Sequence, residues 1–443
     1  MDPVVVPHHA TTSGRAQSHV HPRTRLSVIA TIAGALTMSM IGMLPAQASP
    51  SETPSLTYGL NGKVRATVQS GSTIWVAGQF SQVVRNSSTK PPYTGTPGTE
   101  TNIAAFELDG TPIDVALELP GTGSIVYDLH VNGSTIYAAG RFGAQGAVNL
   151  IAFDGTTGRT IQAYSTPPLY SIHRAGGVLY AGGKKLWRVA SPTQEVVVAT
   201  PGTNAVGTRT RVPQVVDIGT APQGGLFLAC KCDWMNDPQT PSKAFVHLFA
   251  DGTYDQEWVP GRSGAEPNGL LERWGTSDES QAFGWEIFVT GVRTYLAAGG
   301  SDFVMAVDTA TGDRDWITDT SGSAQTVGWF DPTSAPDQLI VGGHWTRIDD
   351  GDGEYCQPRL AALDPVTGEL FEDWTPALNP DYAGAWTTMQ ASDQALWVGG
   401  EFSKVAGNWQ RGADASCVLD ARGRPTPAGA NAFQQRIARF PAS

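Results

Sequence analysis

The sequence predicts an all-β fold that is built from one repeated unit, and three observations support this prediction. A short apolar strand that ends in small residues recurs along the chain, as in "IWVAGQF" (74–80), "IYAAGRF" (136–142) and "LWVGGEF" (396–402). Glycine is abundant, charged residues make up only 16% of the chain, and no long stretch shows the 3.6-residue period of a helix. The chain has 443 residues, more than one hydrophobic core usually serves, so it must divide into domains or repeat.

Each repeated unit is expected to contain four strands joined by tight turns. The strand that ends in small residues follows another short strand, such as "VYDLHVNG" (126–133). It precedes an apolar strand, an Asp and a Thr-Gly turn, as in "LAALDPVTGEL" (360–370). Such an Asp accepts hydrogen bonds from forward backbone amides, and the Gly adopts the positive φ that the turn needs. We expect the Gly pairs to allow close packing between units, not catalysis.

Seven such units can be aligned on the second strand. Their marker residues are 43 to 68 positions apart: Trp75, Tyr137, Tyr180, Phe227, Tyr295, Ile340 and Trp397. Four-stranded units at this spacing are typical of a β-propeller. We therefore predict a seven-bladed β-propeller of four-stranded blades, with blades that start near residues 64, 125, 169, 214, 284, 325 and 385.

The two ends of the chain are predicted to close the ring. An open solenoid is the alternative, but its terminal repeats should resemble polar caps, and the last repeat keeps the apolar strand "RIARF" (436–440). Only residues 441–443 follow, so the last blade lacks an outer strand. Because exposed strand edges invite mispairing, we expect residues 56–60 to pair with residues 436–440.

The repeats also resemble a known family. "LWVGGEFSKVAG" (396–407) and "LAALDPVTGEL" (360–370) resemble the repeats of secreted bacterial β-propeller proteins of the delta-sixty type. The resemblance covers nearly all of 64–440, and it implies a fold without implying catalytic residues. "FVMAVDTATGDRDW" (303–316) is also similar to repeats of quinoprotein dehydrogenases, which implies eight blades and an adjacent Cys-Cys pair. Seven units and the separated pair in Cys230-Lys231-Cys232 depart from that pattern, so no quinone cofactor is expected.

Residues 1–48 read as a secretory signal peptide that precedes a single propeller domain, 49–443. A basic N-terminal region leads into an uncharged apolar run that ends in "AQA", the pattern of a signal cleaved between Ala48 and Ser49. The alternative is an uncleaved membrane anchor, although Gly34 and Gly42 would weaken a spanning helix.

The charge of the mature chain limits its partners. Removing residues 1–48 takes away one acidic and three basic residues, which changes the formal net charge from −12 to −14. An acidic chain without Lys/Arg runs is a poor ligand for polyanions. We expect no nucleic-acid partner, no membrane insertion after signal removal, and a secreted monomer that is extracellular or associated with the cell surface.

All four cysteines remain in the mature chain, and an even set in an exported protein usually pairs. Cys356 and Cys417 occupy equivalent loop positions in blades six and seven, so we predict a disulfide between them. Cys230 and Cys232 are then left to each other.

One acidic stretch is a candidate metal site. "DDGDGEYC" (349–356) could offer a calcium ion the carboxylates of Asp350, Asp352 and Glu354. It lacks the full twelve-residue ligand spacing, so a solvated acidic turn is the favoured interpretation. No other cofactor is expected.

The long insertions all fall between the second and third strands of a unit, at 81–101, 233–243, 346–358 and 403–417. In a propeller these loops emerge on one face, as a binding surface requires. Trp234, Trp345 and Trp409 lie within or beside them and are predicted to contact a ligand. The alternative is that they cover the bases of the loops.

The sequence favours a non-catalytic extracellular recognition or scaffolding module that binds a glycan or a protein through its loop-rich face. The alternative is a secreted propeller enzyme that acts on extracellular carbohydrate. Neither a Gly-x-Ser-x-Gly elbow nor a His-Glu-x-x-His helix is present. Glycosidase carboxylates are defined by their separation in space, so carboxylates that converge at the channel mouth would favour the enzyme.

Export provides the first testable prediction. The protein recovered from culture medium should begin at Ser49, because the apolar run and the small residues at 46 and 48 direct cleavage there. N-terminal sequencing of the secreted protein measures this. Recovery in the membrane fraction with the leader attached would contradict it.

Overall fold

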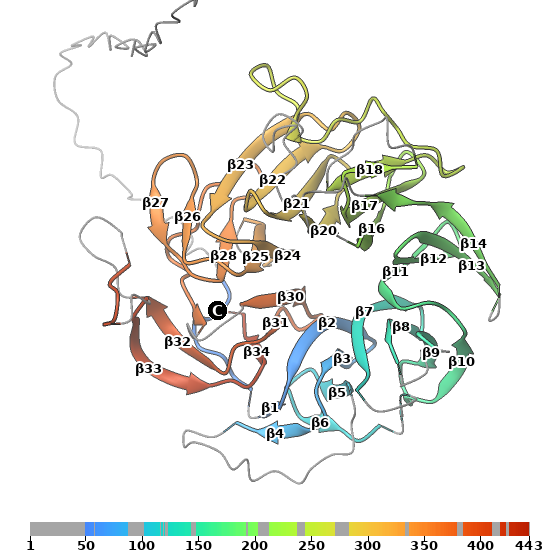
Figure 1. The fold of residues 1–443 in the computed structure, drawn as a ribbon. Coiled ribbons are helices and arrows are strands. Elements are labelled where there is room, and N and C mark those ends of the chain that lie inside the picture. Colours follow the sequence, from blue (N-terminus) through green and yellow to red (C-terminus); the bar gives the residue numbers. More distant parts are fainter. Residues whose placement is uncertain are drawn as a thin grey trace, which may run out of the picture. The chain divides into compact units, whose positions relative to one another are not determined.

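A computed structural model describes residues 49–56, 58–86, 102–115, 117, 119, 123–142, 148–191, 194–202, 212–236, 244–270, 283–332, 336–378, 384–409, 417–421 and 425–442. These residues form an all-β ring of seven blades around a central channel (Figure 1). The predicted signal peptide, 1–48, lies outside the described residues. Within the described ranges, no helix combines the length and the apolar character needed to cross a bilayer.

The innermost strand of each blade lines the channel and starts within one residue of the position expected from the sequence. These inner strands are β2 (Lys63–Ser70), β7 (Ile125–Asn132), β11 (Leu169–Ala175), β16 (Gln214–Thr220), β20 (Phe283–Val289), β24 (Ala324–Phe330) and β30 (Ala385–Gln390). Figure 1 shows all seven around the centre of the ring.

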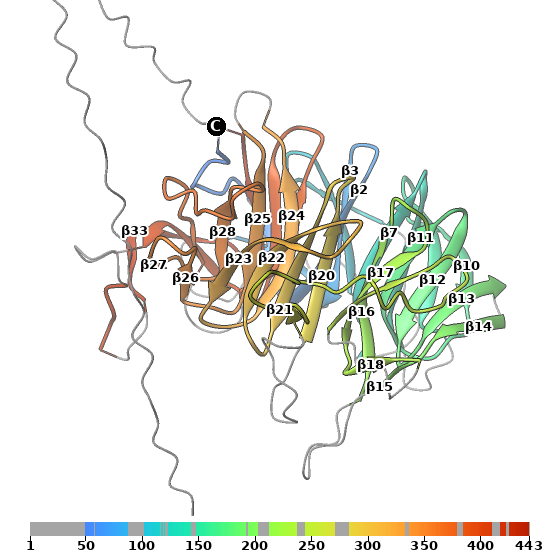
Figure 2. The same ribbon diagram turned by 90° about the horizontal axis from the view of Figure 1, so that it is seen from above.

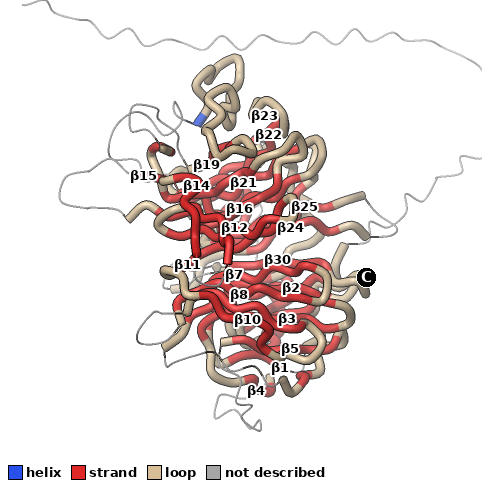
Figure 3. The backbone as a smooth tube through the Cα atoms, turned by 90° about the vertical axis from the view of Figure 1, so that its right-hand side faces the viewer, coloured by secondary structure: helices blue, strands red, loops and turns tan. Residues whose placement is uncertain are grey.

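The remaining strands follow outward in antiparallel order (Figures 2 and 3). The second strands are β3 (Thr73–Gln79), β8 (Thr135–Arg141), β12 (Val178–Gly183), β17 (Leu226–Lys231), β21 (Arg293–Gly299), β25 (Gln338–Gly343) and β31 (Leu396–Gly400). The third strands are β5 (Ile103–Glu107), β9 (Leu150–Asp154), β13 (Leu186–Ser191), β19 (Phe245–Leu248), β22 (Phe303–Asp308), β28 (Leu360–Leu363) and β34 (Ile437–Phe440). The outer strands β6 (Pro112–Ile113), β10 (Thr160–Tyr164), β14 (Gln194–Ala199) and β23 (Arg314–Thr320) complete blades one, two, three and five. Blades four and six have single outer bridges instead, at Leu248–Tyr254 and Leu363–Leu370.

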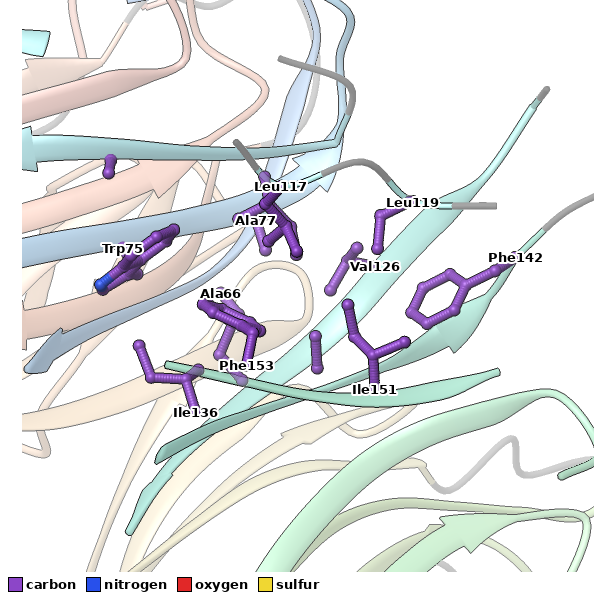
Figure 4. Close-up of a cluster of buried hydrophobic side chains, with 14 residues drawn as sticks. Ala66, Trp75, Ala77, Leu117, Leu119, Val126, Ile136, Phe142, Ile151 and Phe153 are labelled. Atoms are coloured by element: carbon purple, nitrogen blue, oxygen red, sulfur yellow. The ribbon is translucent and has the colours of Figure 1, made fainter. Parts of the chain in front are cut away.

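The hydrophobic core lies between blades as well as within them. Figure 4 shows the cluster between blades one and two, in which Trp75 packs edge-on against Phe153 of the next blade, with ring centroids 4.9 Å apart. The indole Nε1 of Trp75 donates a hydrogen bond to the carbonyl of Gly155, at 2.9 Å. Truncating such a fully buried Trp to Ala typically costs about 3–5 kcal/mol, so the marker aromatic of the repeat is a structural residue.

The small residues that end the second strand allow the blades to approach closely. A Cβ on Gly342 would lie 2.6 Å from the Cβ of Ala385 in the next blade, and one on Gly182 would lie 2.8 Å from Val215 Cγ1. A Cβ on Gly399 would collide with Val64, across the junction of blades seven and one. The predicted packing role of these glycines is therefore confirmed.

The ring closes where the two ends of the chain meet, in the last blade. Ser51 N donates to Pro441 O at 2.7 Å and Ser55 N donates to Arg439 O at 2.8 Å. Pro50 forms an isolated antiparallel bridge with Ala442. Strands from both ends thus share blade seven, as predicted.

The predicted register of this closure needs one correction. Residues 50–55 supply the outer edge of blade seven, whereas we expected residues 56–60 to do so. The latter segment instead continues as β1 (Tyr58–Leu60), which pairs with β4 (Val83–Arg85). Leu60 N donates a backbone hydrogen bond to Gln435 O in the C-terminal region, at 2.8 Å. The cause is that the segment entering blade one pairs with an insertion of that blade.

The pairing of β1 with β4 forms a short arm beside blade one, and similar arms occur at three other blades. In each arm, the segment that enters a blade pairs with the insertion between the second and third strands of that blade. The additional pairings are β15 (Pro201–Gly202) with β18 (Trp234–Met235), β23 with the hairpin β26 (Arg347–Asp349) and β27 (Glu354–Cys356), and β29 (Ala377–Leu378) with β32 (Lys404–Trp409) and β33 (Pro427–Phe433). A disulfide between Cys356 and Cys417, whose Cα atoms are 4.7 Å apart, links two of these insertions. This is the pairing that the sequence predicts.

The closure yields a stability prediction. Deleting residues 49–56 from the mature chain should lower the free energy of unfolding by about 4 kcal/mol, because it removes the buried Leu56 side chain and the backbone bonds of Ser51 and Ser55. Chemical denaturation of both chains measures the difference. Leu56→Ala should account for about half of it, and identical denaturation midpoints would contradict this closure.

Candidate functional site

Each inner strand carries a one-residue register shift near its start, and the residue that the shift leaves unpaired faces the central channel. The seven unpaired residues are Arg65, Tyr127, Tyr170, Val216, Trp285, Gln325 and Trp386. All seven line a single cavity of about 540 Å³ at the channel mouth. A β-bulge re-aims the extra side chain, so the repeat itself delivers one residue from every blade to this cavity.

Two cations and two indoles form a continuous chain along one side of the mouth. The guanidinium carbon of Arg65 lies 4.0 Å from the ring centroid of Trp386. Trp386 contacts Trp285 edge-on, with centroids 5.6 Å apart. The ammonium of Lys231 lies 4.3 Å from the ring centroid of Trp285. Both cation–ring distances fall within the reach of cation–π attraction.

Phenol groups continue the chain on the opposite side. The rings of Tyr127 and Tyr170 are 4.9 Å apart, and Gln214 Nε2 donates to the Tyr170 hydroxyl at 3.1 Å. Gln214 pairs with Lys231 across the strands β16 and β17. Aromatic, cationic and amide side chains therefore surround the mouth.

Lys231 reaches the cavity from a second strand, and its backbone is held on both sides. It lies between Cys230 and Cys232, which form a disulfide with Cα atoms 5.3 Å apart. Both cysteines are buried. A Cβ on Gly284 would meet the Cys230 backbone nitrogen at 3.0 Å, so this glycine lets blade five come close to the bridge. That approach places Trp285 beside Lys231.

Three carboxyl groups lie deeper in the channel, each one residue after a bulge, and each accepts a backbone amide from the next blade. Asp128 Oδ2 accepts from Ile172 N at 2.8 Å, and Asp217 Oδ2 accepts from Ile287 N at 2.8 Å. In the same way, Glu286 Oε2 accepts from Val327 N, at 3.0 Å. These carboxyls satisfy amides on the channel-facing edge of the inner strands, which would otherwise lack partners.

Hydroxyl groups join the inner strands at two further junctions in the same positions. Thr387 and Thr67 place their Oγ1 atoms 3.0 Å apart across blades seven and one. Thr326 and Thr388 do so at 3.4 Å across blades six and seven. The position after the bulge is therefore used mainly to connect blades.

The channel environment favours the neutral form of the three carboxyls. Desolvation raises the pKa of Asp128 to about 8, and the charge of Asp217 adds to this shift. Desolvation also raises the pKa of Asp217. The pKa of Glu286 lies well above its ordinary value, through desolvation and then the charge of Asp217. Desolvation, the largest cause for all three groups, explains the common direction.

The two cations are also affected by their surroundings. Desolvation lowers the pKa of Arg65, which the charge of Glu401 partly offsets. Desolvation lowers the pKa of Lys231, and the positive charge of Arg65 lowers it further. Glu401 lies 2.8 Å from Lys63 Nζ and 3.8 Å from Arg65 Nη2. In the described part of the chain, Lys231 has no ion-pair partner.

Two of the three tryptophans predicted to bind a ligand, Trp234 and Trp345, are not part of the lining of this cavity. Trp345 is only 2% exposed, and its Nε1 donates to Gln357 O at 2.7 Å, so it covers the base of its loop. Trp234 is half-buried in β18, with its ring over Gly202. The backbone of Trp409 belongs to β32, and its side chain lies outside the described residues.

The acidic stretch 349–356 folds as the hairpin of β26 and β27. Asp350 Oδ2 accepts from Leu370 N at 3.0 Å, and Asp350 Oδ1 accepts from Asp352 N at 3.1 Å. Glu354 forms an ion pair with Arg347. No group of three or more His, Cys, Asp or Glu side chains that could hold a metal occurs within the described residues. Calcium binding at Asp350, Asp352 and Glu354 stays a prediction.

Sequence reasoning did not single out the channel residues, although the sequence contains a signal for them. When the inner strands are aligned they read "VRATV" (64–68), "VYDLH" (126–130), "LYSIH" (169–173), "VVDIG" (215–219), "GWEIF" (284–288), "AQTVG" (324–328) and "AWTTM" (385–389). The second letter is aromatic or polar in six of these seven segments and follows a small or apolar residue. This aromatic or polar second position, aligned across the inner strands, would have located the channel mouth.

Comparisons with known proteins show no family for this chain. No protein-family model matches the chain, and no curated protein matches it. Neither result supports the resemblance to delta-sixty-type repeats. Solved structures with a similar fold include the WD40 β-propeller domain of Doa1, at 10% identity and a TM-score of 0.49 over 78% of this chain and 93% of that one.

Two further structures are similar to a lower degree. The computationally designed Ika8 protein matches at 10% identity and a TM-score of 0.45, over 87% of this chain and 98% of that one. The extracellular domain of the hybrid two component system BT4673 from B. thetaiotaomicron matches at 11% identity and a TM-score of 0.42. That match covers 80% of this chain and 39% of the other.

The channel carboxyls yield a pH prediction. The folded-state pKa of Asp128, about 8, is higher than the ordinary value of 3.8, so the folded protein retains a proton that the unfolded chain releases. The stability this proton contributes is complete below pH 3.8 and is lost as the pH rises through about 8. Asp128→Asn should therefore reduce the fall in unfolding free energy between pH 5 and pH 8.5 by more than about 1 kcal/mol.

Urea denaturation of both chains across that pH range measures the effect. Asp217 and Glu286 should leave part of the pH dependence in place, because their pKa values are raised as well. Asp114→Asn, at an exposed position, is the matched control and should keep the wild-type slope. An unchanged slope in Asp128→Asn would show that Asp128 is already ionised at neutral pH.

Proposed function

We propose that this chain is a non-catalytic, exported recognition module that binds the end of a glycan chain in the mouth of its central channel. The observation that carries the proposal is the set of aromatic, cationic and amide side chains that the bulges aim into one cavity. A scaffold that repeats seven times and varies only the delivered side chain is suited to presenting a binding surface.

The size of the cavity supports a small ligand or the end of a longer one. Its volume of about 540 Å³ is within the range of small-molecule sites in proteins, roughly 300–1,000 Å³. The indoles of Trp285 and Trp386 offer flat apolar faces, and the tyrosine hydroxyls and amides offer hydrogen bonds. Sugar rings present this combination of apolar faces and hydroxyl groups. A folded protein partner would instead have to contact the arms around the mouth.

The bonding of the channel carboxyls supports binding without turnover. Asp128 and Asp217 each accept a second backbone amide, from Leu129 and Ile218, in addition to the one from the next blade. Hydrolysis of a glycosidic bond needs one carboxyl free to donate a proton and another free to act on the sugar. Side chains that hold the blades together are poorly placed for that work.

A secreted enzyme acting on extracellular carbohydrate is the second candidate. It is favoured by the same carboxyls, because a raised pKa is the property that a general acid needs. Export itself is supported by the two disulfides, since disulfides persist in oxidising compartments.

The test is binding to a glycan array, followed by calorimetric titration of the saccharides that bind. Trp386→Ala should weaken binding about 10- to 100-fold, as expected for loss of a central aromatic contact. Trp234→Ala, outside the cavity, should leave affinity unchanged. If Trp234→Ala lost binding and Trp386→Ala did not, the binding site would lie on the arms and not in the cavity. Release of reducing sugar from a bound saccharide would favour the enzyme.

A further inference from the structure

We infer that the channel mouth is a site for an acidic sugar, with its carboxylate on Lys231 and its ring against the indoles of Trp285 and Trp386. The inference rests on the proposed function and names the chemical class of the ligand.

Lys231 is a half-buried cation in the wall of the cavity. Its ammonium lies over the Trp285 ring at 4.3 Å and has no carboxylate partner in the described part of the chain. Removing an ammonium from water without pairing it is costly. The positive charge of Arg65 is near enough to disfavour the charged form of Lys231 further. An anion beside the Lys231 ammonium would relieve both costs.

The guanidinium of Arg65 is only partly bonded. Its contact with Glu401 is loose, at 3.8 Å, because Glu401 lies closer to Lys63, at 2.8 Å. The Nε atom of Arg65 is shielded from solvent and has no hydrogen-bond partner among the described residues. The guanidinium therefore retains a donor that a ligand oxygen can use.

The charges at the mouth favour one negative charge on the ligand. Glu401 shares its negative charge between Lys63 and Arg65, which lie 2.8 and 3.8 Å away, and the Lys63 side chain is 43% exposed. Within the cavity, the charge left without a counter-ion is close to that of Lys231 alone. A carboxylate matches this charge, whereas a doubly charged phosphate exceeds it.

The floor of the channel does not oppose an anion. Desolvation raises the pKa of Asp128 to about 8 and also raises those of Asp217 and Glu286, so these groups together carry less negative charge than three ordinary carboxyls would. Had these groups been fully ionised, three negative charges would have faced the ligand. Ionisation of the three carboxyls at higher pH should weaken the binding of an acid.

The remaining lining suits a sugar that carries the carboxylate. Gln325 is 8% exposed, and its amide oxygen lies in the cavity lining without a hydrogen-bond partner in the described residues. This acceptor fits a ring hydroxyl, and the indole faces fit the apolar face of the ring. The disulfide on either side of Lys231 holds its backbone in place, which reduces the ordering cost of binding.

The experiment compares acids with matched neutral ligands by calorimetric titration. Two sources of the carboxylate are tested: trigalacturonate against its methyl ester, and sialyllactose against its methyl ester. At least one acid should bind ten-fold or more tightly than its neutral partner. Lys231→Met, which keeps the apolar stem, should abolish that difference, and Lys231→Arg should restore most of it. Lys184→Met, on an exposed turn outside the cavity, should behave as wild type.

The outcomes separate this inference from the proposed function. Equal affinity for the acid and its neutral partner, with both lost in Trp386→Ala, would leave the recognition module in place and overturn the carboxylate site. Tighter binding of galactose 6-phosphate than of galacturonate would overturn the choice of a single negative charge. If neither acids nor neutral saccharides bind to the folded wild type, both proposals fail.

Discussion

The feature on which the structure depends is the unpaired edge of each innermost strand. One edge of the strand bonds to the rest of its blade, while the other edge faces the channel and has no strand beside it. Backbone amides enclosed by protein must find acceptors. Asp128, Asp217 and Glu286 provide them from the neighbouring blades, and paired threonines connect two more junctions. The packing of the blades and the chemistry of the channel therefore have the same origin.

The bulge that precedes each of these positions has two consequences. It bends the strand and ends its regular pairing, and it turns one side chain per blade toward the channel mouth. The residues that follow each bulge hold the inner strands in place. The bulge residues themselves, which face the channel mouth, can therefore vary without loss of the fold. Arg65, Trp285 and Trp386 occupy the position that Val216 occupies in blade four. A cavity with specific chemistry can thus arise on a repetitive scaffold.

The electrostatics of the channel are arranged in two levels. Cations and aromatic rings surround the mouth, and carboxyls whose raised pKa values favour the neutral form lie beneath them. The short distances between Lys231, Trp285, Trp386 and Arg65 follow from the close approach of the blades, for which glycines such as Gly284 leave room. The arms and the Cys356–Cys417 disulfide belong to the insertions around the ring. They offer further surface, which the channel chemistry does not require.

The sequence predicted the all-β class, the seven units, the strand starts and the pairing of Cys356 with Cys417. These features depend on local patterns and on the spacing of repeats, both of which are read along the chain. It placed the terminal strands in one blade but misjudged their register, because the choice between residues 50–55 and 56–60 depends on β4, an insertion in another part of the sequence. Only the tertiary structure decided that Trp345 is buried and that Arg65, Lys231, Trp285 and Trp386 meet. These four residues are spread over more than three hundred positions, and no local pattern fixes which blades face one another across a channel. Closure of the ring does.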